Sequence, residues 1–111
     1  MRLFRAYLLA ASAGLTLASA PALAADEFQL TIKDHKFDPA EVKIPAGRKV
    51  KLVVRNQDAT AEEFESFDLN REKVVAPGGQ IDVWVGPLAA GRYEYFGDFH
   101  PDTARGHIVA E

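Results

Sequence analysis

The sequence contains no cysteine, and its only methionine is Met1. Without cysteine the chain can form no disulfide, so a small domain built from it must be stabilised by packing alone. The lack of sulfur beyond Met1 also leaves no soft ligand for copper(I) or for an iron–sulfur cluster. The metal ligands that remain are imidazole and carboxylate.

Charge is missing from the stretch between Ala6 and Ala20, which follows two arginines. Ala22-Leu23-Ala24 then fits the small-x-small pattern of signal peptidase sites. We therefore expect residues 1–24 to be a cleaved signal peptide and residues 25–111 to form a periplasmic domain that does not span the membrane. An uncleaved membrane anchor is the alternative interpretation.

Basic residues are in the minority in the expected domain. Removal of Arg2 and Arg5 leaves 11 basic and 16 acidic residues, a net charge of −5. An acidic exported domain is a poor nucleic-acid binder, so we expect no nucleic-acid partner.

Convincing helical periodicity is also absent. Apolar residues instead alternate with polar ones in short runs bounded by Gly, Pro, Asn and Asp. This pattern is typical of a small antiparallel sandwich or barrel of seven or eight strands. The segment 62–69 is ambiguous, because its two phenylalanines are three residues apart, but we favour a strand. The expected strands are 28–32, 41–44, 48–55, 62–69, 71–75, 80–85 and a final pair within 91–109.

Two of the three histidines lie in the stretch Gly91 to Val109, which reads as strand, polar loop and strand. The loop carries Asp98, His100 and Asp102 within five residues. Carboxylate and imidazole are ligands for hard and borderline metals. The loop is therefore expected to form one wall of a metal site, although Asp102 also suits a turn or cap.

A set of motifs in this order resembles the cupredoxin family over nearly the whole expected domain. The resemblance implies a cupredoxin-like antiparallel Greek-key β-sandwich. The motifs are Phe37-Asp38-Pro39, Val42-x-Ile44-x-Ala46-Gly47, Val50-x-Leu52-x-Val54-x-Asn56-x-Asp58, Pro77-Gly78-Gly79, and Gly91-x-Tyr93-x-Tyr95 with His100 and Gly106-x-Ile108-Val109.

The resemblance also implies where blue-copper ligands would fall. The cysteine position of such a protein falls on Gly97, the C-terminal histidine on His100, and the axial methionine near Ala104. The first histidine falls at about Glu62 or Glu63. A trigonal copper–thiolate site is impossible without its thiolate. No blue-copper site is therefore expected.

Two acidic motifs resemble a narrower group. Glu62-Glu63-Phe64-Glu65-Ser66 and Gly97-Asp98-Phe99-His100-Pro101 are similar to the cupredoxin domain of EfeO-type proteins and to the small cupredoxin partner of Ftr-type ferrous-iron permeases. This resemblance implies a periplasmic component that binds Fe(II), or helps to oxidise it, for delivery to a membrane iron permease. A second periplasmic iron-binding protein is a further implied partner.

The resemblance brings three loops to one end of the sandwich. They carry His35, Glu63, Asp98 and His100, which form the predicted metal site; Glu62 replaces Glu63 if the register shifts by one residue. The implied cargo or cofactor is Fe(II)/Fe(III) or Cu(II). His107 is expected on the surface.

No catalytic triad is available, since there is no cysteine and no serine with a matching His–Asp arrangement. A ferroxidase-type role stays open, but we favour a binding or transport component. Two other functions remain: a metal-free cupredoxin-fold module that docks a basic partner, and a Cu(II) carrier.

Overall fold

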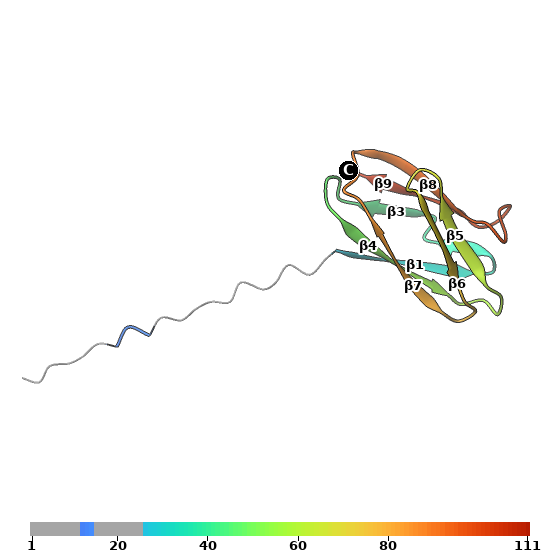
Figure 1. Cartoon of the computed structure of the whole chain (residues 1–111), viewed down its shortest axis with the longest axis horizontal. Coiled ribbons are helices and arrows are strands. Elements are labelled where there is room, and N and C mark those ends of the chain that lie inside the picture. The colour runs from blue at the N-terminus through green and yellow to red at the C-terminus, as the bar shows by residue number, and fades with distance from the viewer. Residues whose placement is uncertain (1–11, 15–25) are drawn as a thin grey trace, which may run out of the picture.

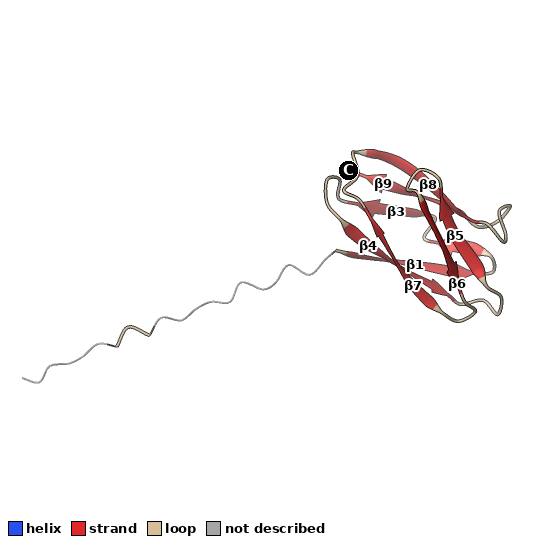
Figure 2. Cartoon of the chain, viewed as in Figure 1, coloured by secondary structure: helices blue, strands red, loops and turns tan. Residues whose placement is uncertain are grey.

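The computed structural model describes residues 12–14 and 26–111, and the described part contains nine strands and no helix (Figures 1 and 2). The predicted signal peptide, residues 1–24, lies outside the described residues except for 12–14, which form neither helix nor strand. No described segment is a helix long and apolar enough to cross a membrane.

The strands form two sheets that face each other across one core. The four-stranded sheet has the order β2-β1-β4-β7, and the five-stranded sheet has the order β3-β9-β8-β5-β6. The strands are β1 (Glu27–Lys33), β2 (Lys36–Asp38), β3 (Glu41–Ile44), β4 (Val50–Asn56), β5 (Glu62–Ser66), β6 (Arg71–Val75), β7 (Gln80–Val85), β8 (Gly91–Gly97) and β9 (Arg105–Ala110).

The all-β sandwich is confirmed, but two details of the prediction are wrong. There are nine strands rather than seven or eight, because Lys36–Asp38 pairs with the end of β1 instead of forming only a turn. The sheets are also mixed rather than antiparallel. β1 runs parallel to β4, and β3 runs parallel to β9, because the chain crosses between the sheets after β2 and again after β3.

Alternation of side chains along the strands builds the core. Alternate residues of β1, β7 and β9 face the core and are buried or, at Phe28 and Ile81, partly buried, as the period of two requires. The ambiguous segment 62–69 contains strand β5, and only Phe64 of its two phenylalanines is buried; Phe67 is 80% exposed in the turn that follows.

Three aromatic rings pack together at one end of this core. Phe37 contacts Tyr95 edge-on with ring centroids 5.0 Å apart, and Phe64 lies 5.1 Å from Tyr95. Phe37 is two residues from His35, Phe64 is two from Glu62, and Tyr95 is two from Gly97. Since residues two apart on an extended chain share a face, this aromatic layer supports those three positions.

Candidate functional site

His35 lies in the two-residue turn between β1 and β2. Asp34 and His35 have φ values of 52° and 57°, as in the primed turns that join tight hairpins. A non-glycine residue rarely adopts this left-handed conformation. The turn is held by Asp58, whose carboxylate accepts hydrogen bonds from the backbone N–H groups of Asp34 (2.8 Å) and His35 (3.0 Å).

Asp58 is itself fixed by the preceding residues. Its N–H donates to the side chain of Asn56, and the Asn56 amide donates to the carbonyls of Thr60 and Val75. The backbone N–H of His35, then that of Asp34, and the nearby His35 and His100 rings lower the pKa of Asp58. Asp58, predicted as a turn residue, therefore also orients the turn that carries His35.

Glu62 is the first residue of β5, and its side chain points into the sandwich. It is 1% exposed, yet its carboxylate is fully engaged. Oε1 accepts hydrogen bonds from the backbone N–H groups of Phe99 (2.9 Å) and Glu63 (3.0 Å). Oε2 accepts from Nδ1 of His100 at 2.5 Å. A buried carboxylate with this many donors has a fixed position.

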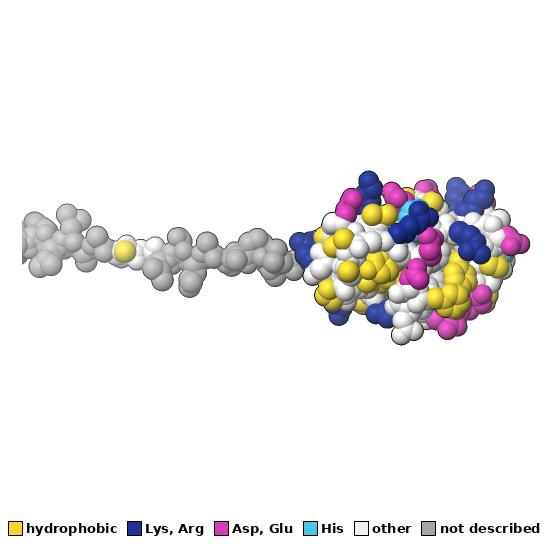
Figure 3. Space-filling model, turned by 90° about the horizontal axis from the view of Figure 1, so that it is seen from above, with side chains coloured by type: hydrophobic (Ala, Val, Ile, Leu, Met, Phe, Trp, Pro, Cys, Tyr) yellow, Lys and Arg dark blue, Asp and Glu magenta, His cyan; other side chains and the backbone are white. Residues whose placement is uncertain are grey.

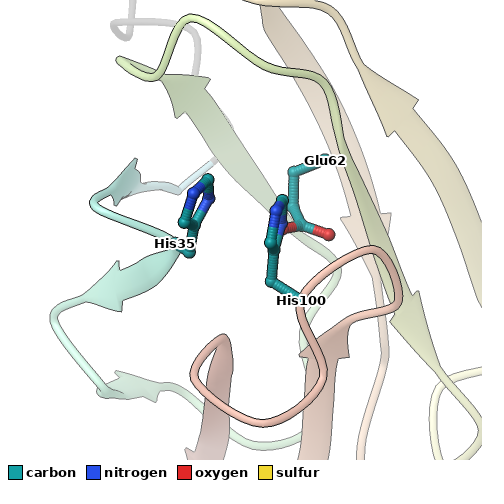
Figure 4. A group of neighbouring side chains, drawn as sticks. All are labelled: His35, Glu62 and His100. Carbon is teal, nitrogen blue, oxygen red and sulfur yellow. The ribbon is translucent and has the colours of Figure 1, made fainter.

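His100 lies in the loop between β8 and β9 and faces His35 across the rim. The two imidazole rings are stacked, with centroids 3.6 Å apart and an interplanar angle of 16°. Figure 4 shows the rings side by side, with the Glu62 carboxylate next to His100. His35, Glu62 and His100 each offer a ligand atom, and these three atoms lie within 4.8 Å of one another.

The structure brings together two of the four predicted metal ligands, His35 and His100. Glu62 rather than Glu63 joins them, because successive residues of β5 point to opposite faces and Glu62 has the inward one. Asp98 is exposed, and its charge acts on Glu63 and Glu65, so it lies with the other face of the sheet. His107 lies elsewhere, half-buried, with Nε2 3.0 Å from Glu41.

The space that a cysteine would need at position 97 is filled. A Cβ added to Gly97 would lie 2.6 Å from Cδ of Glu62 and 2.6 Å from Cβ of Ala104. The carboxyl group of Glu62 thus replaces the missing thiol, and a small buried alanine stands where the axial methionine would fall. These residues do not fit a blue-copper centre.

The donor set does fit a borderline metal. A metal that takes Glu62 and His100 as ligands replaces the hydrogen bond between them, whereas Nδ1 of His35 faces the carboxylate of Asp58 at 3.5 Å, which leaves Nε2 of His35 with its lone pair. Carboxylate partners of this kind fix the tautomer and the orientation of metal-binding histidines. The two imidazoles and the carboxylate form a set with the composition of the two-histidine–one-carboxylate site.

A second group of carboxylates lies on the outer face of the same strand. Glu63 and Glu65 of β5 and Glu72 of β6 bring ligand atoms within 4.8 Å of one another. A hydrogen bond with Glu72, burial, and the charges of Glu72, Asp98 and Glu65 raise the pKa of Glu63 to about 7. Glu72 was not predicted from the sequence, because its place in the group depends on the β5–β6 register that pairs it with Glu65.

Comparison with known proteins identifies the family of the fold. Residues 5–110 match the family model of the cupredoxin-like domain. An uncharacterized protein of Rickettsia prowazekii (strain Madrid E) is 53% identical over 83 residues. That match covers 75% of this chain and 66% of the relative, so slightly less than two thirds of the relative's length is spanned.

Solved structures with the same fold include copper proteins. Auracyanin A, described as a blue copper protein from Chloroflexus aurantiacus, superimposes with a TM-score of 0.69 at 15% identity over 79% of this chain and 100% of its own. Amicyanin from Paracoccus versutus gives a TM-score of 0.60 at 23% identity, covering 85% of this chain and 87% of its own. Identities this low show a shared fold.

Proposed function

The chain belongs to the cupredoxin-like domain family, and on that premise we propose that it is a periplasmic metal-binding component of a ferrous-iron acquisition system. The observation that carries the proposal is the set His35, Glu62 and His100, whose ligand atoms lie within 4.8 Å of one another, with the carboxyl group of Glu62 against Gly97, the position that the resemblance assigns to the thiol. In this role Fe(II) is the cargo. The protein binds it and presents it to a membrane permease.

The chemistry of the three side chains supports Fe(II). Two imidazoles and one carboxylate, with further coordination positions left to water, are typical of non-haem Fe(II) sites, whereas copper(I) prefers thiolate and thioether. The site is at the rim of the sandwich, and His35 is partly exposed, so a hydrated ion can enter and leave. The similarity of the acidic motifs at 62–66 and 97–101 to iron-uptake components supports two further parts of the proposal. These are delivery of iron to a permease and cooperation with a second periplasmic iron-binding protein.

A docking module without metal has less support. Such a surface needs a continuous acidic patch to attract a basic partner. The described residues offer one acidic group, Glu63, Glu65 and Glu72 beside Asp98, on the outer sheet face away from the histidines; on the one face seen in Figure 3, acidic, basic and apolar side chains are interspersed. The stacked histidines and the buried Glu62 have no use in a surface contact of that kind.

The first test is anaerobic calorimetry with Fe(II) on the wild type and on His100→Ala, with His107→Ala as the matched control. We expect about one Fe(II) per chain in the wild type and in H107A, and an affinity at least about 10–100-fold lower in H100A. Absence of Fe(II) binding while Cu(II) binds would make the protein a copper carrier. Absence of both would leave the docking module.

The second test addresses the pathway. Cells in which H100A replaces the wild-type protein should take up less Fe(II) when iron is limiting. Unchanged uptake would contradict the acquisition role, even if the purified protein binds iron.

A further inference from the structure

We propose a second cation site on the outer face of the five-stranded sheet, formed by Glu63, Glu65 and Glu72 and selective for hard divalent cations with oxygen ligands. It is separate from the histidine site and does not depend on the proposed function. The two sites lie on opposite faces of β5, since Glu62 points inward and Glu63 outward.

The first observation is the geometry of the three carboxylates. Glu65 lies directly opposite Glu72 across the β5–β6 pair, and Glu63 is two residues from Glu65 on the same face. One oxygen from each lies within 4.8 Å of the others. A cation with metal–oxygen distances of about 2.3–2.6 Å can contact three oxygens at that spacing.

The second observation concerns Glu63 itself. Its side chain is 8% exposed, and its Oε1 atom is buried without a hydrogen-bond partner. Buried carboxylate oxygens are nearly always paired, because an unpaired one loses its hydration without compensation. A cation bound between Glu63 and its neighbours provides the missing partner.

No basic side chain in the described residues neutralises these charges. In the described part of the chain, no basic nitrogen lies within 4 Å of Glu63, Glu65 or Glu72. The two basic residues that flank Glu72 on β6 turn to the opposite side, where Arg71 donates to the carbonyl of Trp84 and Lys73 to that of Asp82. Like charges directly opposite each other destabilise a sheet, so this arrangement costs stability unless a bound cation, or the proton shared by Glu63 and Glu72, offsets it.

Apolar side chains flank the cluster. Val74 is opposite Glu63 on one side, and Phe96 is opposite Glu65 on the other. Electrostatic attraction to a cation is stronger beside such groups than in bulk water. Protection of the edge strand β6 against association would explain exposed charges on β6, but not a buried carboxylate oxygen without a partner on the neighbouring strand.

Mn²⁺ is the probe that tests the proposal, because its electron paramagnetic resonance signal distinguishes free from bound ion. The measurement uses the double variant H35A/H100A, which removes the imidazoles of the inner site. We expect this variant to bind one Mn²⁺. Adding E65Q or E72Q should weaken binding at least tenfold. These two positions are reached by solvent, so their variants should fold.

Glu94→Gln is the matched control, since it removes one carboxylate from the same outer face on β8 but away from the cluster. Its Mn²⁺ affinity should equal that of the H35A/H100A parent. Loss of Mn²⁺ binding in H35A/H100A, or an unchanged affinity after E72Q, would overturn the proposal. A second readout is paramagnetic broadening of backbone resonances, which should centre on residues 63, 65 and 72.

Discussion

Glu62 and Glu63 are neighbours on one strand, both buried, yet their carboxylates are in opposite electrostatic situations. Glu62 accepts two backbone N–H bonds and one from His100, so every oxygen has a donor. Glu63 faces three other acidic residues, and one of its oxygens has no partner. The difference shows that burial alone says little about a carboxylate: the groups that face it decide whether its charge stabilises the fold.

The largest effect expected from this comparison is on folding stability. Glu62→Ala leaves one buried and one partly buried N–H group and the His100 ring without their acceptor, and should lower the free energy of unfolding by about 2–5 kcal/mol. Glu63→Gln removes a repelled charge with no change in shape, so stability should stay the same or rise. Urea unfolding of the metal-free protein at neutral pH measures both. Equal losses of unfolding free energy in the two variants would mean that the two carboxylates do not differ in their effect on stability.

A second prediction concerns the close contact at Gly97. Gly97→Ala forces a Cβ against Glu62 and Ala104, and should cost about 1–3 kcal/mol of stability. Combining it with Glu62→Ala removes one of the two clashes, so the losses should be less than additive, with a coupling of about 0.5–3 kcal/mol. A double-mutant cycle by urea unfolding tests this. Simple additivity would mean that Glu62 does not occupy the space next to position 97.

A third prediction concerns the turn that presents His35. Asp58→Ala removes the acceptor of the N–H groups of Asp34 and His35, which hold left-handed conformations. Fe(II) affinity should fall by about tenfold, as for other partners of metal-binding histidines, while Glu63→Gln should leave it unchanged. Anaerobic calorimetry compares the two variants. Asp58→Asn, which keeps an oxygen acceptor, should recover part of the loss.

The smallest expected effect is at the third histidine, which belongs to neither cluster. The hydrogen bond from His107 and its charge lower the pKa of Glu41, against an opposing effect of burial. A lowered pKa in the folded state stabilises the fold above the unfolded pKa, and this contribution is lost as pH falls through the folded value. In His107→Ala the pKa of Glu41 should rise toward its ordinary value. Titration of the Glu41 side chain by NMR measures it, and Fe(II) affinity should not change.

Sequence patterns predicted the sandwich because alternation and turn residues are local signals that a packed sheet must satisfy. They did not predict the parallel pairs of β1 with β4 and β3 with β9, because strand order depends on where the chain crosses between sheets. No local pattern records that crossing.

The candidate site divides in the same way. His35 and His100 were predicted together from the loops that the family resemblance brings to one end, and the structure stacks their rings. The choice between Glu62 and Glu63 needed the register of β5, since a shift by one residue exchanges the two faces of a strand. Asp98 lies with the outer face because it comes one residue after the buried Gly97, and adjacent residues of an extended chain point to opposite sides. The place of Glu72 in the outer carboxylate group could be predicted only from the pairing of β5 with β6. These strands are joined by a turn with Asn70 at positive φ.

The position of β9 in its sheet has a consequence for synthesis. β9 is the last strand in sequence, but it lies between β3 and β8 and is the only neighbour of β3 among the described strands. A nascent chain that still lacks residues 105–110 therefore cannot close the five-stranded sheet, and the loop that carries His100 has no second anchor. The arrangement of His100 against His35 and Glu62 should consequently form only after β9 has emerged and paired.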